Sequence, residues 1–274
     1  SHINNPPGFK NIGSSSNTKH AAIYNPKKHI YCLQFHPEVT HTKNGQIIIN
    51  NFVYKICGCI KTWTTNNIIK DITKTIQDQV GKQKIILALS GGVDSTVVAA
   101  LLNKAVPKQL TCVFIDTGLL RKNEVLEVQD NISIKLGINL VTIDAKKIFF
   151  KKLKGASNPE KKRKIIGETF IRLFEAHASK IKNIDYLAQG TIYPDIIESS
   201  SKDAKSEIIK SHHNVGGLPK RMKFELVEPI KLLFKDEVRR IGRALKIPVK
   251  LIHRHPFPGP GLAVRIIGEV SQDR

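Results

Sequence analysis

The sequence predicts an α/β protein built on a doubly wound parallel sheet, and three observations lead to this prediction. From residue 84 onward, short apolar runs of strand length alternate with longer helical patterns. A glycine-rich loop stands where the first of these runs passes into a helix. The chain has 274 residues, of which 41% are hydrophobic, so it can bury a sizeable core and lacks the composition of a disordered chain.

The glycine-rich loop belongs to a predicted βαβ unit. Residues 84–89 are apolar after Lys84, as expected for a strand buried on both faces, and residues 110–115 are apolar apart from Thr111. Residues 95–105 lie between them and are predicted to be helical. Their apolar stripe consists of Val97, Val98, Leu101, Leu102 and Ala105.

The alternation continues toward the end of the chain. Further elements are predicted as helices over 123–136 and 235–245 and as strands over 139–143, 186–189 and 224–227. Asn158 and Pro159 predict another helix start, because they supply a capping side chain and a proline at the first helical position. The core stripe of this helix is formed by Ile166, Phe170, Leu173, Phe174 and Ile181. Such an order indicates a parallel sheet covered on both faces.

The first sixty residues follow a different pattern. Residues 21–24 and 31–34 are short strand-like runs among Asn, Pro and Gly, and residues 47–56 form an apolar stretch. Sixty residues supply only a marginal core by themselves. We therefore expect them to be the end of another domain, followed by a polar linker over 62–67.

The chain is strongly basic, with 44 Lys and Arg against 23 Asp and Glu and a net charge of +21. Charge of this size ordinarily suggests nucleic acid, because clustered cations release counterions from phosphates. The lysines here are scattered among many Ile and Asn residues. We therefore favour a compositional bias first, a phosphate-bearing small substrate second and RNA third.

The sequence also bears on the compartment. No stretch approaches the roughly 18 apolar residues of a membrane helix, and the opening residues are neither a signal peptide nor a natural initiator. Cys32, Cys57, Cys59 and Cys112 form no CxxC pair. The cysteine pattern favours a reducing, cytoplasmic environment over a disulfide scaffold or a zinc site. The opening residues favour a piece of a longer protein.

The loop at the first strand-to-helix change has the composition of a phosphate cradle. Its residues are Ser90, Gly91, Gly92, Val93, Asp94 and Ser95. Backbone N–H groups and the positive end of a helix dipole converge at such a place, and glycines allow the main chain to approach an anion. The two serines can donate to phosphate oxygens, and the aspartate can hold Mg²⁺. The alternative is an ordinary turn with a capping residue; a Walker loop is excluded because its Gly-Lys-Ser/Thr ending is missing.

This loop resembles the PP-loop of the N-type ATP pyrophosphatases, which cleave ATP between the α and β phosphates. That superfamily has several acceptors, including those of NAD, asparagine and argininosuccinate synthetases and of tRNA-thiolating enzymes. Four downstream strings narrow the choice, and together they closely resemble the GMP synthetase family. The strings are 114–121 (FIDTGLLR), 190–199 (GTIYPDIIES), 209–219 (IKSHHNVGGLP) and 254–261 (RHPFPGPG).

The resemblance implies a reaction. GMP synthetases adenylate the C2 oxygen of xanthosine 5'-monophosphate with ATP, and ammonia from glutamine then displaces AMP. ATP and Mg²⁺ are thus the implied cofactors, a homodimer is implied for the complete protein, and neither a membrane nor nucleic acid is expected as a partner. The implied ATP contacts are Ser90, Gly91, Gly92, Val93, Asp94 and Ser95, with Asp94 also the metal ligand.

Three charged residues match the family's catalytic positions. Lys210 matches the lysine of the adenylation step, where a cation and Mg²⁺ neutralise the triphosphate; the alternative is one more solvated lysine. Asp195 and Glu198 are three residues apart, so they would face the same side of a helical turn. They match acidic residues of the family's active-site lid, although acids are also favoured by the dipole at a helix start.

Five further residues are expected at the substrate. Arg163 lies in the charged run 161–164 near a helix start, where either solvent surrounds the run or an anion offsets its cost. The resemblance implies that Arg163 contacts xanthosine 5'-monophosphate. His212 and His213 are expected to contact phosphate or the adenylated intermediate, the alternative being a surface loop. Pro258 and Gly259 lie in a stiff turn that borders the nucleotide site in the family.

The amino-terminal part resembles the His-Pro-Glu end of a class I glutamine amidotransferase. The resemblance makes His36 the base for a cysteine nucleophile and Glu38 the group that orients its imidazole. A turn histidine beside a proline is the alternative. The nucleophile is expected on a strand-to-helix elbow before Ser1, so we expect no glutaminase activity from this chain alone.

These expectations divide the chain into three parts. Residues 1–61 would be the end of the amidotransferase domain, residues 62–260 the ATP pyrophosphatase domain of the adenine nucleotide alpha hydrolase type, and residues 261–274 the start of a dimerisation domain. Two other functions stay open at this point. One is a tRNA-thiolating PP-loop enzyme, which the charge favours and the lack of paired cysteines opposes. The other is an inactive fragment.

Overall fold

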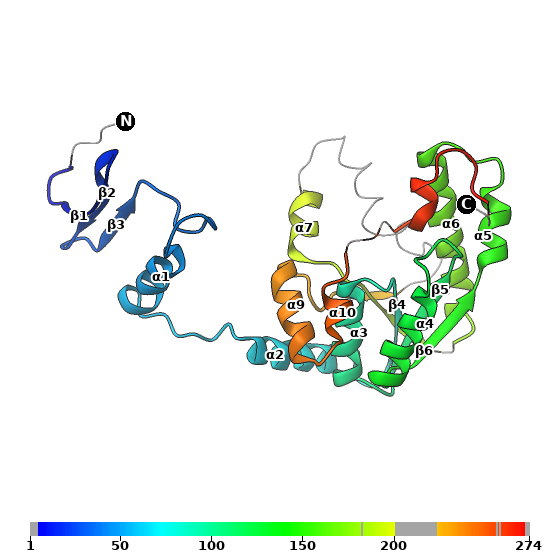
Figure 1. Ribbon diagram of the computed structural model, residues 1–274. Coiled ribbons are helices and arrows are strands. Elements are labelled where there is room, and N and C mark those ends of the chain that lie inside the picture. Colours follow the sequence, from blue (N-terminus) through cyan, green and yellow to red (C-terminus); the bar gives the residue numbers. More distant parts are fainter. Residues whose placement is uncertain (1–4, 182, 201–223, 256, 258, 272–274) are drawn as a thin grey trace. The chain divides into compact units, whose positions relative to one another are not determined.

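The computed structural model describes residues 5–181, 183–200, 224–255, 257 and 259–271 (Figure 1). The chain forms two compact units, Ser1–Thr62 and Trp63–Arg274. The expected site residues Lys210, His212, His213 and Pro258 lie outside the described residues. The assignment of three domains from the sequence stays a prediction.

The first unit contains a small antiparallel sheet. Its described strands are β1 (Lys10–Ser15), β2 (Thr18–Asn25) and β3 (Ile30–Leu33), in the order β1-β2-β3. The two strand-like runs of the sequence are thus confirmed, whereas β1 is polar and largely exposed and gave no apolar signal. The apolar stretch 47–56 is helical, as α1 (Gly45–Asn50) and the π-helix Asn51–Ile56.

The second unit begins with a helix that the sequence analysis missed. Helix α2 covers Thr65–Val80, and the hydroxyl of its N-cap Thr64 accepts a hydrogen bond from the Asn67 N–H. The expected linker over 62–67 is therefore wrong in its second half. Polar capping residues suggested a linker here, although an apolar stripe follows them. The buried residues of this stripe are Ile68, Ile69, Ile76 and Val80.

The sheet of the second unit confirms the predicted fold class. Within the described residues it has five strands in the order β6-β5-β4-β7-β8, and every pair is parallel. From β4 the chain adds β5 and then β6 on one side of the sheet. It later adds β7 and then β8 on the other side of β4. Ligands of open α/β sheets bind at such a reversal, beyond the carboxyl ends of the strands. The strands are β4 (Lys84–Ala88), β5 (Leu110–Asp116), β6 (Leu140–Asp144), β7 (Ile184–Ala188) and β8 (Glu225–Val227).

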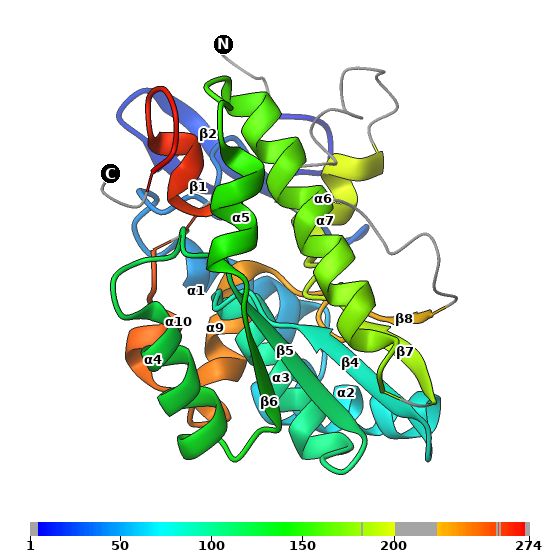
Figure 2. The ribbon, with the colours of Figure 1, turned by 90° about the vertical axis from the view of Figure 1, so that its right-hand side faces the viewer.

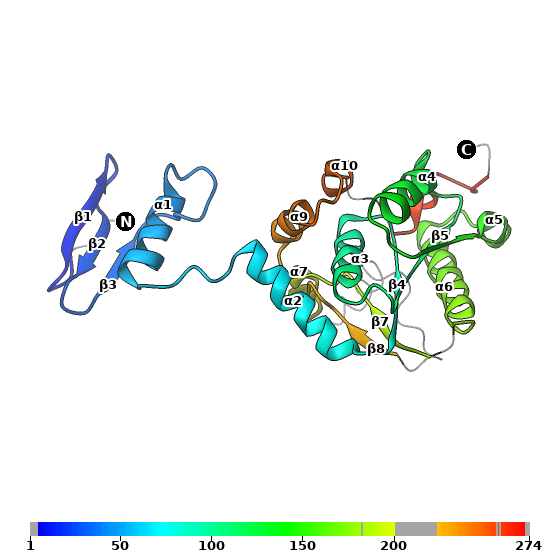
Figure 3. The ribbon, with the colours of Figure 1, turned by 90° about the horizontal axis from the view of Figure 1, so that it is seen from below.

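Helices cover both faces of this sheet, with α2, α3 and α9 on one face and α5 and α6 on the other (Figures 2 and 3). The described helices are α3 (Val93–Ala105), α4 (Glu124–Val128) with the π-helix Gln129–Lys135, α5 (Lys146–Leu153), α6 (Pro159–Ala178), α7 (Tyr193–Ser200), α9 (Lys235–Ala244), α10 (Val249–Ile252) and the short 3₁₀ helix η3 (Gly261–Arg265).

The central strand β4 shows why the sheet needs both layers. Ile85 and Leu87 belong to the hydrophobic cluster that contains α3, whereas Ile86 belongs to the cluster of α5 and α6. All three side chains are at most 1% exposed. Because alternate side chains of a strand point to opposite faces, the apolar run of β4 after Lys84 must be covered on both faces.

The start of α6 agrees with the sequence prediction. Asn158 is the N-cap, and its side-chain oxygen accepts a hydrogen bond from the Lys161 N–H at 3.1 Å. Pro159 occupies the first helical position. Both devices satisfy the backbone at a helix start, which explains why this boundary was predictable.

The described chain beyond α10 packs against α6 within the second unit. Ala263 and Val270 are buried in the same cluster as Ile166 and Phe174 of α6. The expectation that residues 261–274 open a further domain stays a prediction.

Two further observations concern the whole described chain. No described helix has the length and apolar character needed to cross a lipid bilayer. The four cysteines all lie within the described residues and are free thiols. Burial raises the pKa of Cys112 to about 12, so this thiol stays protonated and inert.

Candidate active site

The loop of Ser90–Ser95 joins the carboxyl end of β4 to α3. Gly91 has a φ of 73°, and Gly92 is the N-cap of α3. The hydroxyl oxygens of Ser90 and Ser95 lie 3.0 Å apart, and the Ser95 hydroxyl donates to the Gly92 carbonyl oxygen at 3.1 Å. The N–H of Gly92 donates to the Ser90 hydroxyl at 3.3 Å. The loop is therefore preformed by its own polar groups.

Two glycines permit close packing around this loop. A Cβ on Gly91 would lie 3.1 Å from a carboxylate oxygen of Glu124 and 3.4 Å from Nη1 of Arg254. The positive φ of Gly91 would also strain any residue other than glycine at this position. A Cβ on Gly190 would lie 3.4 Å from both the Asp94 Cβ and the Ser95 N. The string 190–199 thus begins just after β7, at a residue that lies directly beside the loop.

Asp94 lies in the first turn of α3 with an unusual environment. Its Oδ2 accepts from Nζ of Lys235 at 2.5 Å, while Oδ1 is buried and has no hydrogen-bond partner among the described residues. A buried carboxylate oxygen without a donor suits a cation. Mg²⁺ typically takes one or two carboxylates together with substrate phosphates and water. The described part of the chain contains no cluster of three or more His, Cys, Asp or Glu that could hold a metal by itself.

A cavity of about 340 Å³ opens beside the loop. Its walls come from segments far apart in the sequence, which the sheet brings together at the carboxyl ends of β4 and β5. The lining combines the polar residues of the loop with apolar side chains of α6 and of Phe257. The described residues that line the cavity include Ser90, Gly91, Gly92, Val93, Asp94, Arg121, Glu124, Ile166, Phe170, Lys235, Arg239, Arg254, Phe257, Gly259 and Gly261.

Positive charge exceeds negative charge in this lining. The described lining residues include four cations, Arg121, Lys235, Arg239 and Arg254, and two carboxylates, Asp94 and Glu124. The Nε of Arg239 is buried and has no hydrogen-bond partner among the described residues. A guanidinium group whose Nε has no partner among the described residues, in a cavity beside a phosphate-type loop, favours a polyanionic ligand.

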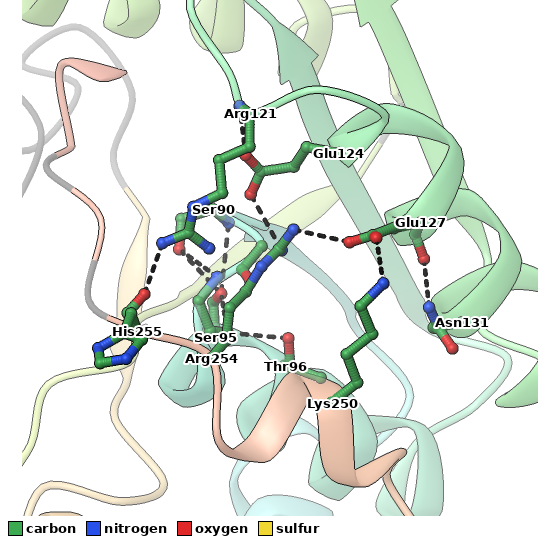
Figure 4. Close-up of polar contacts among 12 residues, drawn as sticks. Ser90, Ser95, Thr96, Arg121, Glu124, Glu127, Asn131, Lys250, Arg254 and His255 are labelled. Carbon is green, nitrogen blue, oxygen red and sulfur yellow. Dashed lines mark hydrogen bonds and ion pairs between the residues drawn. The ribbon is translucent and has the colours of Figure 1, made fainter. Parts of the chain in front are cut away.

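Arg254 forms hydrogen bonds and ion pairs that connect the loop to neighbouring elements (Figure 4). Its Nη1 lies 3.0 Å from Oε1 of Glu124 and donates to the carbonyl oxygen of Gly91 at 3.1 Å, and its Nη2 lies 3.0 Å from Oε2 of Glu127. The side chains of Arg254 and Glu124 are only 11% and 3% exposed. Lys250 pairs with the other oxygen of Glu127 at 2.5 Å. This network fixes one loop carbonyl to α4 and α10.

Arg121 connects the same region to the segment after α10. Its Nη2 donates to the carbonyl oxygen of His255 at 2.6 Å, and its guanidinium carbon lies 4.5 Å from the ring centre of Phe257. Its backbone N–H donates to Oε2 of Glu124 at 2.9 Å. Arg121 thus places Phe257 in the cavity wall.

The structure brings many of the expected site residues together. Ser90, Gly91, Gly92, Val93, Asp94 and Gly259 all line the cavity. Ser95 contributes through its hydrogen bonds within the loop. Arg163 lies on α6 and pairs with Glu160. It is three residues before Ile166 and seven before Phe170, so it shares a helix face with these two lining residues.

Asp195 and Glu198 lie on α7. Oδ2 of Asp195 accepts from the Ile192 N–H at 2.9 Å, which is a helix-start contact, and Glu198 is largely exposed. Neither residue is in the cavity lining. Their expected catalytic role stays a prediction.

His36 and Glu38 form a pair in the first unit. Nδ1 of His36 lies 2.8 Å from Oε1 of Glu38, and the Thr42 hydroxyl donates to the His36 carbonyl oxygen at 2.6 Å. A hydrogen bond from its own backbone N–H and the contact with His36 lower the pKa of Glu38. A Cβ on Gly45 would lie 1.9 Å from the Pro37 carbonyl oxygen, so glycine is needed there to hold this turn.

Sequence reasoning missed the cations of the cavity. Lys235 and Arg239 are four residues apart in a predicted helix, and this spacing could have placed both on one face. The expectation for the run 161–164 was also wrong for one member. Lys162 is 0% exposed, so neither solvent nor an external anion surrounds it. Its Nζ donates to backbone carbonyl oxygens at 2.7 and 3.1 Å.

Comparison with solved structures supports the fold. The chain resembles NMN synthetase from Francisella tularensis with a TM-score of 0.55 and 15% identity, over 73% of this chain and 78% of that one. It also resembles the NH3-dependent NAD synthetase from Campylobacter jejuni, with a TM-score of 0.51 and 18% identity, over 69% of this chain and 76% of that one. At these identities the likeness shows a shared fold.

Sequence comparison is more specific. Residues 2–56 match the family Glutamine amidotransferase class-I, and residues 64–171 match the family NAD synthase. The chain is 54% identical over 269 residues to a glutamine-hydrolysing GMP synthase from Cellvibrio japonicus, and 55% identical over 269 residues to one from Hydrogenovibrio crunogenus. Each match covers 98% of this chain and 51% of the relative, so the chain spans about half the length of the curated relatives it matches. Nearly the whole chain is thus similar in sequence to about half of each of these glutamine-hydrolysing GMP synthases.

Proposed function

We propose that this chain carries the ATP-dependent chemistry of a GMP synthase. In this reaction ATP adenylates the C2 oxygen of xanthosine 5'-monophosphate with release of pyrophosphate, and ammonia then displaces AMP to give GMP. The carrying observation is the loop of Ser90–Ser95, which stands at the switch point of a parallel sheet and opens into a cavity with surplus positive charge.

The loop side of the cavity suits the pyrophosphate of ATP. The N-terminus of α3 and the backbone of Gly91 and Gly92 supply a positive field and close approach. Arg239 lines the same cavity with a buried Nε that has no partner within the described residues. Lys235 is paired only with the carboxylate of Asp94 among the ion pairs of the described residues. We assign these two cations to the phosphates, where they would stabilise the charge of the leaving group.

Asp94 is the proposed magnesium ligand. Its buried Oδ1 is available, and one carboxylate with phosphate oxygens and water is a normal set for this ion. When bound, Mg²⁺ would supply neutralisation of the triphosphate charge. The residues of the chain therefore fit this cofactor.

The far side of the cavity suits the acceptor nucleotide. Ile166, Phe170 and Phe257 provide apolar surface for a base, and Arg163 follows the same face of α6. We propose that Arg163 contacts the xanthosine nucleotide, because a planar guanidinium group recognises phosphate or carbonyl pairs with two hydrogen bonds. Gly259 leaves room for the ligand beside them.

Seven expected residues of this proposal are not among the described residues that line the cavity. Arg163, Asp195, Glu198, Lys210, His212, His213 and Pro258 stay predicted from the family resemblance. The same holds for a homodimer of the complete protein and for its cytoplasmic location.

The first unit is proposed to belong to the glutamine-hydrolysing part. The distance of 2.8 Å between Nδ1 of His36 and Glu38 leaves Nε2 as the nitrogen for proton transfer. Glu38 would hold the ring in place, and the pKa-lowering contacts keep its carboxylate ionised. Glutamine would thus be the source of ammonia in the complete protein.

The thiolating alternative is not favoured. The curated relatives at 52–55% identity are GMP synthases. In the second unit the cysteine is Cys112, which is buried and has its pKa raised to about 12. A buried neutral thiol is unsuited to sulfur transfer.

The test is ammonia-dependent GMP formation, assayed on this chain and on one extended at both ends. Pyrophosphate release from ATP that requires xanthosine 5'-monophosphate would support the proposal. Titration calorimetry with ATP and Mg²⁺ provides an independent measure of binding. Absence of both binding and pyrophosphate release from a folded, extended protein would refute it.

A further inference from the structure

One lysine side chain lies entirely inside the second unit. Lys162 is 0% exposed and ranks among the largest fully buried side chains of the described residues. It belongs to the first turn of α6, where the helix dipole opposes a cation. An ammonium group removed from water is costly unless hydrogen bonds replace its hydration. Its contacts therefore indicate what this position does.

Lys162 binds the end of another helix. Its Nζ donates to the carbonyl oxygens of Ala263 at 3.1 Å and Ile266 at 2.7 Å. These carbonyls lie at the carboxyl end of the 3₁₀ helix η3. The last carbonyls of a helix lack donors within the helix, and lysine side chains satisfy them well. Lys162 thus caps η3 from α6.

The other side of η3 rests on the loop after β5. The N–H of Leu262 donates to the carbonyl oxygen of Leu119 at 2.8 Å. A Cβ on Gly261 would lie 2.4 Å from the same oxygen, and Gly261 has a φ of 69°. The approach is so close that only glycine fits. The short helix η3 is therefore clamped between this loop and Lys162.

Both structures joined by Lys162 form walls of the cavity. Ile166 and Phe170 line it from α6, four and eight residues after Lys162. Gly259 and Gly261 line it from the segment that enters η3. The separation of these two walls therefore depends on the contact that Lys162 makes, although Lys162 itself is not a lining residue.

We propose that Lys162 is a positioning residue that holds η3 against α6 and thereby sets the width of the acceptor end of the cavity. The identity of the acceptor, xanthosine 5'-monophosphate, rests on the proposed function. Lys162 acts through the position of Gly259 and the α6 face. The ATP end of the cavity, built from the loop and α9, lies on other elements.

This separation gives a specific test in the intact enzyme. Lys162→Met keeps the length of the side chain and removes its donors. The Michaelis constant for xanthosine 5'-monophosphate should rise on the order of 10- to 100-fold, as expected when a wall moves by about 1 Å. The Michaelis constant for ATP should stay within about twofold. Lys161→Met, an exposed neighbour, is the matched control and should leave both constants unchanged.

A second measurement needs no turnover. Hydrogen exchange at the amides of residues 259–266 should increase in Lys162→Met and not in Lys161→Met. Gly261→Ala should give the same pattern from the opposite side of η3, and it serves as the second variant if Lys162→Met fails to fold. Unchanged exchange, or equal rises in both Michaelis constants, would overturn the proposal. If the wild-type enzyme failed to aminate xanthosine 5'-monophosphate, the proposed function would fall, while the exchange comparison would still decide the role of Lys162.

Discussion

The guanidinium group of Arg254 donates a hydrogen bond to the carbonyl oxygen of Gly91, at 3.1 Å. The two residues are 163 positions apart in the chain. The same group neutralises Glu124, whose carboxylate is 3% exposed and lies directly against the loop. Arg254 therefore holds the loop in shape and cancels a negative charge that would repel phosphate.

Removal of this group should affect both stability and nucleotide binding. Arg254→Met leaves Glu124 buried without a counter-charge, which typically costs about 3–5 kcal/mol in free energy of unfolding. We also expect the Kd for ATP to rise by about tenfold or more, because the loop loses its support. Denaturant titration and calorimetry measure the two effects. The exposed Arg240→Met is the control, and an unchanged ATP affinity in Arg254→Met would contradict the support role.

Asp94→Asn tests the proposed metal ligand with little change in volume. ATP binding should lose most of its dependence on Mg²⁺, since a neutral amide is a weaker ligand than a carboxylate. Turnover should fall on the order of 10²- to 10³-fold, as for other losses of charge stabilisation at a reacting group. Calorimetric titration with and without Mg²⁺ checks the first expectation. An equal Mg²⁺ dependence in wild type and variant would remove Asp94 from the metal site.

Arg239→Met tests the assignment of this arginine, whose Nε lacks a partner in the described part of the chain, to phosphate. The Kd for ATP and the inhibition constant for pyrophosphate should both rise by about tenfold, which is the effect of one charged hydrogen bond. Arg240 follows it on the same helix and pairs with Asp236 on the outside, so Arg240→Met provides the matched comparison. If the two variants bind pyrophosphate equally well, Arg239 does not contact it.

The Glu127 pair predicts a pH dependence of stability. Its hydrogen bond with Lys250, followed by the charges of Lys250 and Arg254, lowers the pKa of Glu127. A carboxyl group with a lowered folded-state pKa contributes stability above its unfolded value, about 4.3, and loses it as pH falls through the folded value. Lys250→Met should therefore reduce the midpoint of thermal unfolding at pH 7 and have no effect at strongly acidic pH. If the unfolding midpoints of wild type and Lys250→Met differ as much in acid as at pH 7, Lys250 stabilises the protein by packing instead of by charge.

Much of this protein could be predicted from local pattern. The continuous apolar run of β4, the Asn158 and Pro159 start of α6 and the glycine-serine loop each depend on neighbouring residues, so their signals survive in the linear sequence. The four strings that resemble the GMP synthetase family indicated the reaction, because several long motifs in the same order are specific for one family. Helix α2 shows the limit of this reasoning, since its polar capping residues resembled a linker.

The sequence by itself determined a parallel α/β sheet with a phosphate-type loop at its first strand. Only the tertiary structure decided which distant cations serve that loop and which lysine is buried. Arg239 and Arg254 reach the cavity from α9 and from the end of α10, and Lys162 meets carbonyls about a hundred residues away. Such contacts arise from packing between elements distant in the chain, and a lysine or arginine has the same local pattern whether solvent or a backbone carbonyl satisfies it.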